Sequence, residues 1–82
     1  MPIRKIKNIL LENPSMTDLI DCLDLVRKNG DVVVVKFDGE REQDFYTLFI
    51  TFSLTKNKSM IRIDHSNLRD AILELLKRYI NS

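Results

Sequence analysis

The chain has 82 residues, enough for one hydrophobic core and too few for two, so a single domain is expected over residues 1–82. Hydrophobic residues make up 44% and charged residues 30%, a composition that excludes an intrinsically disordered chain. Thirteen basic and twelve acidic side chains leave a formal net charge of +1. That charge is too small to attract nucleic acid or an anionic membrane without sequence preference.

Membrane segments and disulfides are not expected either. The longest apolar runs, residues 32–35 and 45–52, are much shorter than a membrane span. The basic N-terminus lacks the apolar stretch of a signal peptide, so a cytoplasmic location is expected. The single cysteine, Cys22, cannot form an internal disulfide, which agrees with a reducing compartment.

Two helices are predicted before residue 31. Ile3, Ile6 and Leu10 recur at helical spacing, which predicts an amphipathic helix over roughly the first dozen residues, ended by Pro14. A second helix is expected to end at Gly30, because glycine readily adopts the left-handed conformation that closes helices. The residues expected to cap its start are Ser15 or Thr17, with Asp18 in the first turn.

Three strands follow. The β-branched run from Val32 to Phe37 predicts the first, since such side chains lose freedom in a helix and suit a pleated sheet. After an acidic connection over residues 38–44, strict alternation from Phe45 to Leu54 predicts the second and longest strand, which is expected to be central. Residues 55–58 form a polar turn, and Met60 to Asp64 form the third strand.

A last helix is predicted from Asn67, which can cap it together with Asp70. Sequential strands joined by short connections favour an antiparallel meander. The predicted fold class is therefore α+β, with a three-stranded antiparallel meander packed against helices in the order α-α-β-β-β-α.

Alternate residues of a strand point to opposite faces of the sheet, so the strand residues can be sorted into two sets. One set is predicted to form the core against the second and third helices: Val33, Val35, Phe37, Tyr46, Leu48, Ile50, Phe52, Ile61 and Ile63. The opposite set contains Val32, Val34, Phe45, Phe49 and Met60, which is too apolar for a surface that only faces water. Three covers are considered: the N-terminal helix, a second copy of the chain, or a different protein.

The sequence contains residues that could suggest a catalytic, metal-binding or phosphate-binding site, but a structural interpretation is preferred for each. Residues 64–66, Asp-His-Ser, contain the residue types of a hydrolase triad, but sequence neighbours cannot stack in the required relay, so a turn is predicted there. Asp18, Asp21 and Asp24 lack the loop geometry of a calcium site and a histidine for zinc. Two glycines are too few for a phosphate-binding loop. No catalytic residue, metal or cofactor is therefore predicted.

The leading hypothesis is a non-enzymatic protein-interaction module that uses the second sheet face, as a homodimer or as an inhibitor or adaptor of another protein. An arrangement of three strands between helices resembles that of several small phage-encoded inhibitors and bacterial immunity proteins, which implies a binding role without assigning it to residues.

The alternative is a weak nucleic-acid-binding regulator. Its candidate residues are Arg4, Lys5, Lys7, Lys56 and Lys58, which gather in two segments of the sequence. Residues 9–20 also resemble the first two helices of winged-helix DNA-binding domains. The basic recognition helix that those domains require does not follow the acidic second helix.

Overall fold

The computed structural model describes residues 2–82. Its helices are α1 (Pro2–Leu11), α2 (Met16–Lys28) and α3 (Leu68–Ile80), its strands are β1 (Val32–Phe37), β2 (Tyr46–Thr51) and β3 (Ile61–His65), and a short 3-10 turn, η1 (Leu54–Lys56), joins β2 to β3. The element order confirms the predicted α+β class.

Helix ends form where local chemistry favours them. The Ser15 side chain accepts a hydrogen bond from the Asp18 backbone N–H at 3.1 Å, and the Asp18 carboxylate accepts one from the Ser15 N–H at 2.9 Å. This reciprocal pair satisfies two donors that a helix start leaves free, so Ser15 and not Thr17 is the cap. Gly30 has a φ of +90°, as predicted for the residue that turns the chain from α2 toward β1.

The start of α3 is capped in a partly different way from the prediction. The Asn67 side chain accepts from the Asp70 N–H at 2.9 Å, as expected. The Asn67 backbone N–H, however, donates to Nδ1 of His65 at 2.9 Å. His65 therefore helps to form the turn between β3 and α3.

The sheet is an antiparallel meander with the order β1-β2-β3, so the second strand is central as predicted. The register places Leu48 between Val35 on β1 and Ile63 on β3, which confirms the predicted division of the strand residues into two faces. The prediction was wrong for Phe37, which was assigned to the core but is 65% exposed because it lies at the hairpin end of β1. β2 ends at Thr51, earlier than predicted, and is no longer than β1. The reason lies at Ser53, whose backbone N–H donates to the carboxylate of Asp31 at 3.1 Å.

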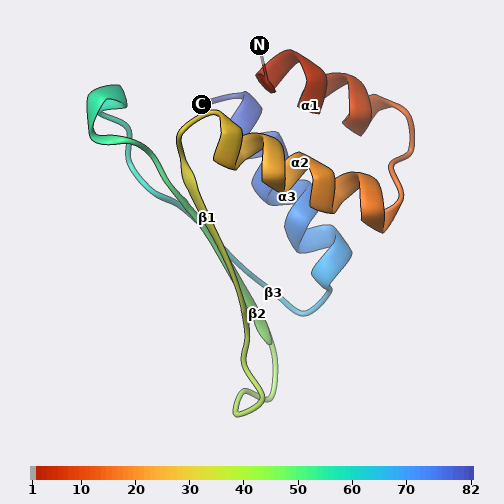
Figure 1. Cartoon of the computed structure of the whole chain (residues 1–82). Coiled ribbons are helices and arrows are strands. Elements are labelled where there is room, and N and C mark those ends of the chain that lie inside the picture. The colour runs from red at the N-terminus through yellow and green to blue at the C-terminus, as the bar shows by residue number, and fades with distance from the viewer. Residues whose placement is uncertain (1) are drawn as a thin grey trace.

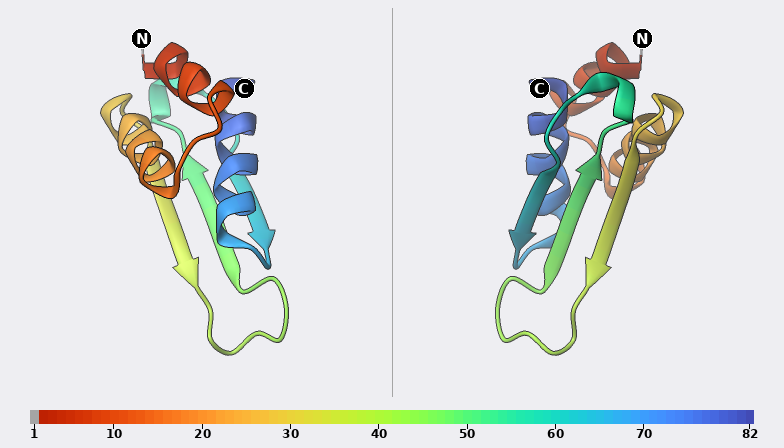
Figure 2. Two further views of the ribbon diagram at one scale, coloured as in Figure 1. Left: turned by 90° about the vertical axis from the view of Figure 1, so that its right-hand side faces the viewer. Right: turned by 90° about the vertical axis from the view of Figure 1, so that its left-hand side faces the viewer.

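Helices cover one face of the sheet (Figure 1). α2 packs against β1, and α3 packs against β2 and β3. α1 lies across α2 and α3 on the side away from the sheet, with Ile6 fully buried (Figures 1 and 2). The core comprises Ile6, Leu19, Cys22, Leu23, Val26, Leu48, Ile50, Phe52, Ile63, Ala71, Ile72, Leu75, Leu76 and Tyr79.

This packing excludes the N-terminal helix as the cover of the second sheet face. The amphipathic pattern of α1 is used to bury Ile6 among the other helices. Of the elements in residues 2–82, none packs on the opposite side of the sheet. Among these same residues, the helices lack the length and apolar character needed to cross a membrane.

Candidate protein-interaction face

The sheet surface that faces away from the helices is here called the open face. It consists of Val32, Val34 and Lys36 on β1, Thr47, Phe49 and Thr51 on β2, and Arg62 and Asp64 on β3, with Met60 just before β3. In the middle row, Phe49 lies between Val34 and Arg62. The apolar residues are partly or largely in solvent: Val32 is 58% exposed, Val34 37% and Met60 53%.

The fifth residue of the predicted set, Phe45, lies at a different place. The Asp38 N–H donates to the Phe45 carbonyl at 2.8 Å, which puts Phe45 at the hairpin end of the sheet. Its ring meets the Tyr46 ring edge-on, with 6.2 Å between the ring centroids. The Tyr46 ring in turn meets the Phe37 ring edge-on, with 5.2 Å between the centroids. These aromatic residues and Arg41 line a hollow of about 340 Å³. The predicted set therefore divides into an apolar group on the open face and one residue of an aromatic hollow.

A polar network occupies the hairpin end of the open face. The Asp64 carboxylate accepts hydrogen bonds from the Thr47 hydroxyl at 2.6 Å, from Arg62 at 3.2 Å and from Arg41 at 3.1 Å. These hydrogen bonds lower the pKa of Asp64 to about 2, so it is ionised at neutral pH. Arg41 also pairs with Asp38 at 3.4 Å, which ties the hairpin loop to the sheet.

The Asp-His-Ser segment forms no catalytic relay. Asp64 is held in the network on the open face, and His65 accepts a hydrogen bond from the backbone of Asn67. The Ser66 hydroxyl instead accepts from the Asp44 backbone N–H at 2.9 Å. The three side chains therefore have separate partners, which lie on the sheet and the hairpin loop for Asp64, in the turn before α3 for His65 and in the hairpin loop for Ser66.

Two of the acidic residues of α2, Asp18 and Asp24, also have local partners. Asp18 belongs to the helix cap, and Asp24 pairs with Arg27 at 2.7 Å and with Lys28 at 3.6 Å. Within residues 2–82, no three His, Cys, Asp or Glu side chains are grouped closely enough to hold a metal ion. Cys22 is fully buried, and burial together with Asp18 and Asp21 raises the pKa of its thiol to about 11. A thiol in this state is a poor nucleophile at neutral pH.

The basic residues of the nucleic-acid hypothesis are only partly brought together. One hollow is lined by Arg4, Lys7 and Ile3. A second hollow is lined by Lys56 and Lys58, and Ile3 borders it as well. Lys5 instead borders a hollow beside the acidic residues of α2. Lys58 donates to the Ser82 carbonyl at 3.1 Å and lies over the Phe52 ring, with 5.4 Å between its ammonium and the ring centroid.

Lys56 has an internal role that the sequence does not signal. Its ammonium group donates to the Asp31 carboxylate at 2.6 Å and to the Asn29 carbonyl at 2.9 Å. The Tyr79 hydroxyl donates to the same carboxylate at 2.6 Å. This buried centre, formed by Asp31, Lys56 and Tyr79, joins the α2–β1 junction, η1 and the end of α3. A lysine used in this way is a poor contact for a phosphate.

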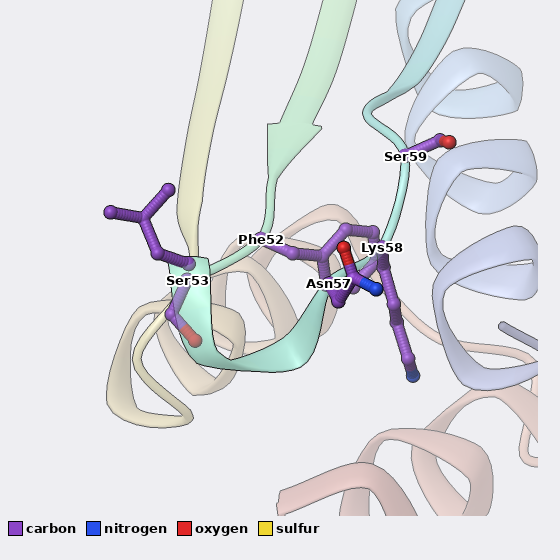
Figure 3. Close-up of a pocket in the computed structure, with 6 residues that line it drawn as sticks. Phe52, Ser53, Asn57, Lys58 and Ser59 are labelled. Atoms are coloured by element: carbon purple, nitrogen blue, oxygen red, sulfur yellow. The ribbon is translucent and has the colours of Figure 1, made fainter.

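The loop between β2 and β3 forms a further shallow hollow of about 250 Å³ (Figure 3). Phe52, Asn57 and Lys58 gather on one side of it, and Lys58 is the single charged residue in its lining. Leu54, at the border of this hollow, is 99% exposed. The hollow thus carries no carboxylate or imidazole that could act as a general acid or base.

The fold and its surface define a small α+β domain with one sheet face under helices and one left open. Comparison with protein-family models, with curated proteins and with solved structures finds no match to this chain.

Proposed function

We propose that this chain is a non-enzymatic protein-interaction module that binds a protein partner through the open face of its sheet. One observation carries the proposal: apolar side chains of two neighbouring strands are presented together, and no element of residues 2–82 covers them. The partner, in this view, adds a layer on the second face of a sheet whose first face is covered by helices.

The energetics favour a covered face. Burying the exposed parts of Val32, Val34 and Met60 contributes on the order of 1 kcal/mol each at roughly 25 cal/mol per Å² of apolar area. Together with the contribution of Phe49 on the same face, the summed free energy of burial is substantial compared with a typical domain stability of about 5 to 15 kcal/mol. Association with a partner therefore provides a favourable free energy of apolar burial that the isolated chain lacks.

The surroundings of the apolar group resemble the organisation of protein interfaces, in which a polar rim encloses an apolar centre. Arg62 and Asp64 form an ion pair at 3.2 Å beside Phe49, and Lys36 pairs with Asp38 at 3.5 Å on the opposite edge. Since these charges are already paired within the chain, a partner needs no matching charges to cover the apolar centre.

Phe49→Asp is expected to weaken association at least tenfold while leaving the helical content unchanged, because it places a charge at the middle of the proposed interface. Association is measured by light scattering after size exclusion over a range of concentrations, and by capture of proteins from the native host on the immobilised chain. Circular dichroism monitors the helices.

Two further variants keep this test decisive. Val32→Asp changes a more exposed position of the same face, and it serves if Phe49→Asp unfolds. Asn8→Asp adds the same charge at an exposed position of α1 and should change nothing. If Val32→Asp binds every partner as tightly as the original chain, the open face is not the interaction surface.

A further inference from the structure

β1 is an edge strand, and the hydrogen-bond pattern shows which of its backbone groups are free. β1 pairs with β2 on one side only. The Asp38 N–H donates to the Phe45 carbonyl, so these two residues form a hydrogen-bonded pair of the antiparallel ladder. Hydrogen-bonded and non-hydrogen-bonded pairs alternate along antiparallel strands. The backbone N–H and C=O groups of Lys36, Val34 and Val32 therefore point toward β2. The N–H and C=O groups of Val33, Val35 and Phe37 therefore point outward along the free edge.

The two edges of the sheet differ in protection. Natural proteins guard edge strands with charged side chains, proline or bulges, because a free edge can pair with another strand. β3 carries Arg62 and Asp64 in its five residues. β1 has four consecutive valines, a single lysine and Phe37, which is 65% exposed. The free edge of β1 is thus extended and rich in residues that favour strands. Its outward N–H and C=O groups can all be paired only by another strand.

We infer that this strand is β1 of a second copy of the chain, paired antiparallel across a two-fold axis into a continuous six-stranded sheet. An antiparallel pair of identical strands requires the axis to be perpendicular to the sheet. Residues that face each other then have the same parity, so the open faces of both copies lie on one side. The helix layers of both copies lie together on the other side.

The side chains select the register. With Val35 on the axis, Phe37 lies opposite Val33 of the partner subunit on the helix side, and this aromatic and β-branched pair occurs twice. Shifting the axis to Val34 would place Phe37 opposite the buried carboxylate of Asp31. The Val35-centred register buries the exposed Phe37 and avoids this mismatch, while a valine lies opposite Lys36 in either register.

The fold leaves space for this pairing. α1 and α2 lie near the end of the sheet where β1 begins, α3 runs along β3 on the side away from the free edge of β1, and the loop between β1 and β2 extends past all three helices (Figure 2). The two-fold axis places the partner's α2 near the opposite end of the paired strands, away from α2 of the first copy. Each Lys36, which lies near its copy across the axis, is already neutralised by Asp38 at 3.5 Å.

This inference rests on the proposed function only in that the chain acts by association, and its test separates the two. The original chain should have twice the chain mass in light scattering. Val35→Pro removes an outward N–H, a position where an edge strand tolerates proline, and is expected to weaken the dimer at least 100-fold with unchanged circular dichroism. Val34→Pro, the matched control, removes an N–H directed at β2 and should lose folded structure.

Hydrogen exchange of the original chain provides a readout that needs no variant. The amides of Val33, Val35 and Phe37 should become protected as the dimer forms on raising the concentration, whereas those of Val34 and Lys36 are protected throughout. A monomer at every concentration overturns the inference, as does a dimer in which the three outward amides still exchange freely. A dimer that dissociates in Val32→Asp but not in Val35→Pro overturns it too, while the open-face proposal stands. A dimer that dissociates in Val35→Pro but not in Val32→Asp supports β1 pairing and shows that the open face is not the dimer interface.

Discussion

Replacement of Asp31 by alanine is expected to lower the free energy of unfolding by about 3 kcal/mol, the lower end of the typical cost of removing one partner of a buried ion pair, because the Lys56 side chain is 27% exposed. The Asp31 side chain has no solvent exposure and accepts hydrogen bonds from Lys56, Tyr79 and the Ser53 backbone. Without the carboxylate, the Lys56 ammonium and the Tyr79 hydroxyl lose their buried acceptor. Because these groups come from three parts of the chain, the loss affects the whole domain.

Urea unfolding monitored by circular dichroism measures this change. Asp24→Ala is the matched control, because Asp24 is an aspartate whose partners Arg27 and Lys28 are exposed on α2. Exposed ion pairs typically contribute about 0 to 1 kcal/mol, so the control should cost little. Equal losses in both variants would show that the buried centre does not hold the fold together.

The same centre makes stability depend on pH in a defined direction. Burial by itself would raise the pKa of Asp31, but the hydrogen bonds from Lys56, Tyr79 and Ser53 outweigh it and hold the pKa below the ordinary 3.8. Because the folded-state pKa is lowered, the contribution is fully present above pH 3.8 and is lost as the pH falls through the folded value. The free energy of unfolding should therefore fall in acid, and this acid-dependent part should be missing in Asp31→Ala.

Tyr79 gives the opposite dependence at high pH. Burial and the neighbouring Asp31 carboxylate raise the pKa of its hydroxyl from 10.0 to about 12. The neutral phenol is favoured in the folded state, so its contribution is complete below pH 10.0 and is lost as the pH rises toward 12. Tyr79→Phe should remove this alkaline decline in urea unfolding curves recorded from pH 9 to 12.

Leu48→Ala is the second change with a large expected effect, a loss of about 2 to 5 kcal/mol in the free energy of unfolding. Leu48 is fully buried on the central strand, between Val35 and Ile63 on the helix-covered face. Truncation removes buried methyl groups and leaves a cavity where sheet and helices meet. Urea unfolding measures the loss.

Thr51→Ala, at an exposed position of the same strand, is the matched control and should change the free energy of unfolding by about 0.5 kcal/mol or less. A Leu48→Ala variant as stable as Thr51→Ala would contradict the assignment of the two sheet faces.

Local patterns were sufficient for much of this fold. Helical spacing at Leu68, Ala71, Ile72, Leu75 and Tyr79 located α3, and the alternation of apolar residues separated Leu48 from Phe49. These signals succeed because periodicity fixes which side chains share a face before any tertiary contact is made. The end of β2 was misplaced for the converse reason, since a carboxylate distant in sequence takes the backbone N–H of Ser53.

The candidate site was only partly accessible to such reasoning. Parity correctly grouped Val32, Val34 and Phe49, but it could not show that Phe45 joins an aromatic hollow at the hairpin end. It also could not show whether α1 covers the open face. An amphipathic helix specifies that one side must be buried, not which surface buries it.

The sequence by itself determined the class, order and approximate bounds of the elements, the cap at Asn67, and the two faces of the sheet, because each follows from the properties of residues near one another in the chain. It left the cap of α2 open between Ser15 and Thr17, and the structure shows that Ser15 is the cap. The tertiary structure alone decided the docking of α1 on the other helices, the uncovered state of the open face, and the joining of Asp31, Lys56 and Tyr79. These depend on contacts between segments distant in the sequence, such as Asp31 and Tyr79, which are 48 residues apart, and neither periodicity nor capping chemistry provides a signal for them.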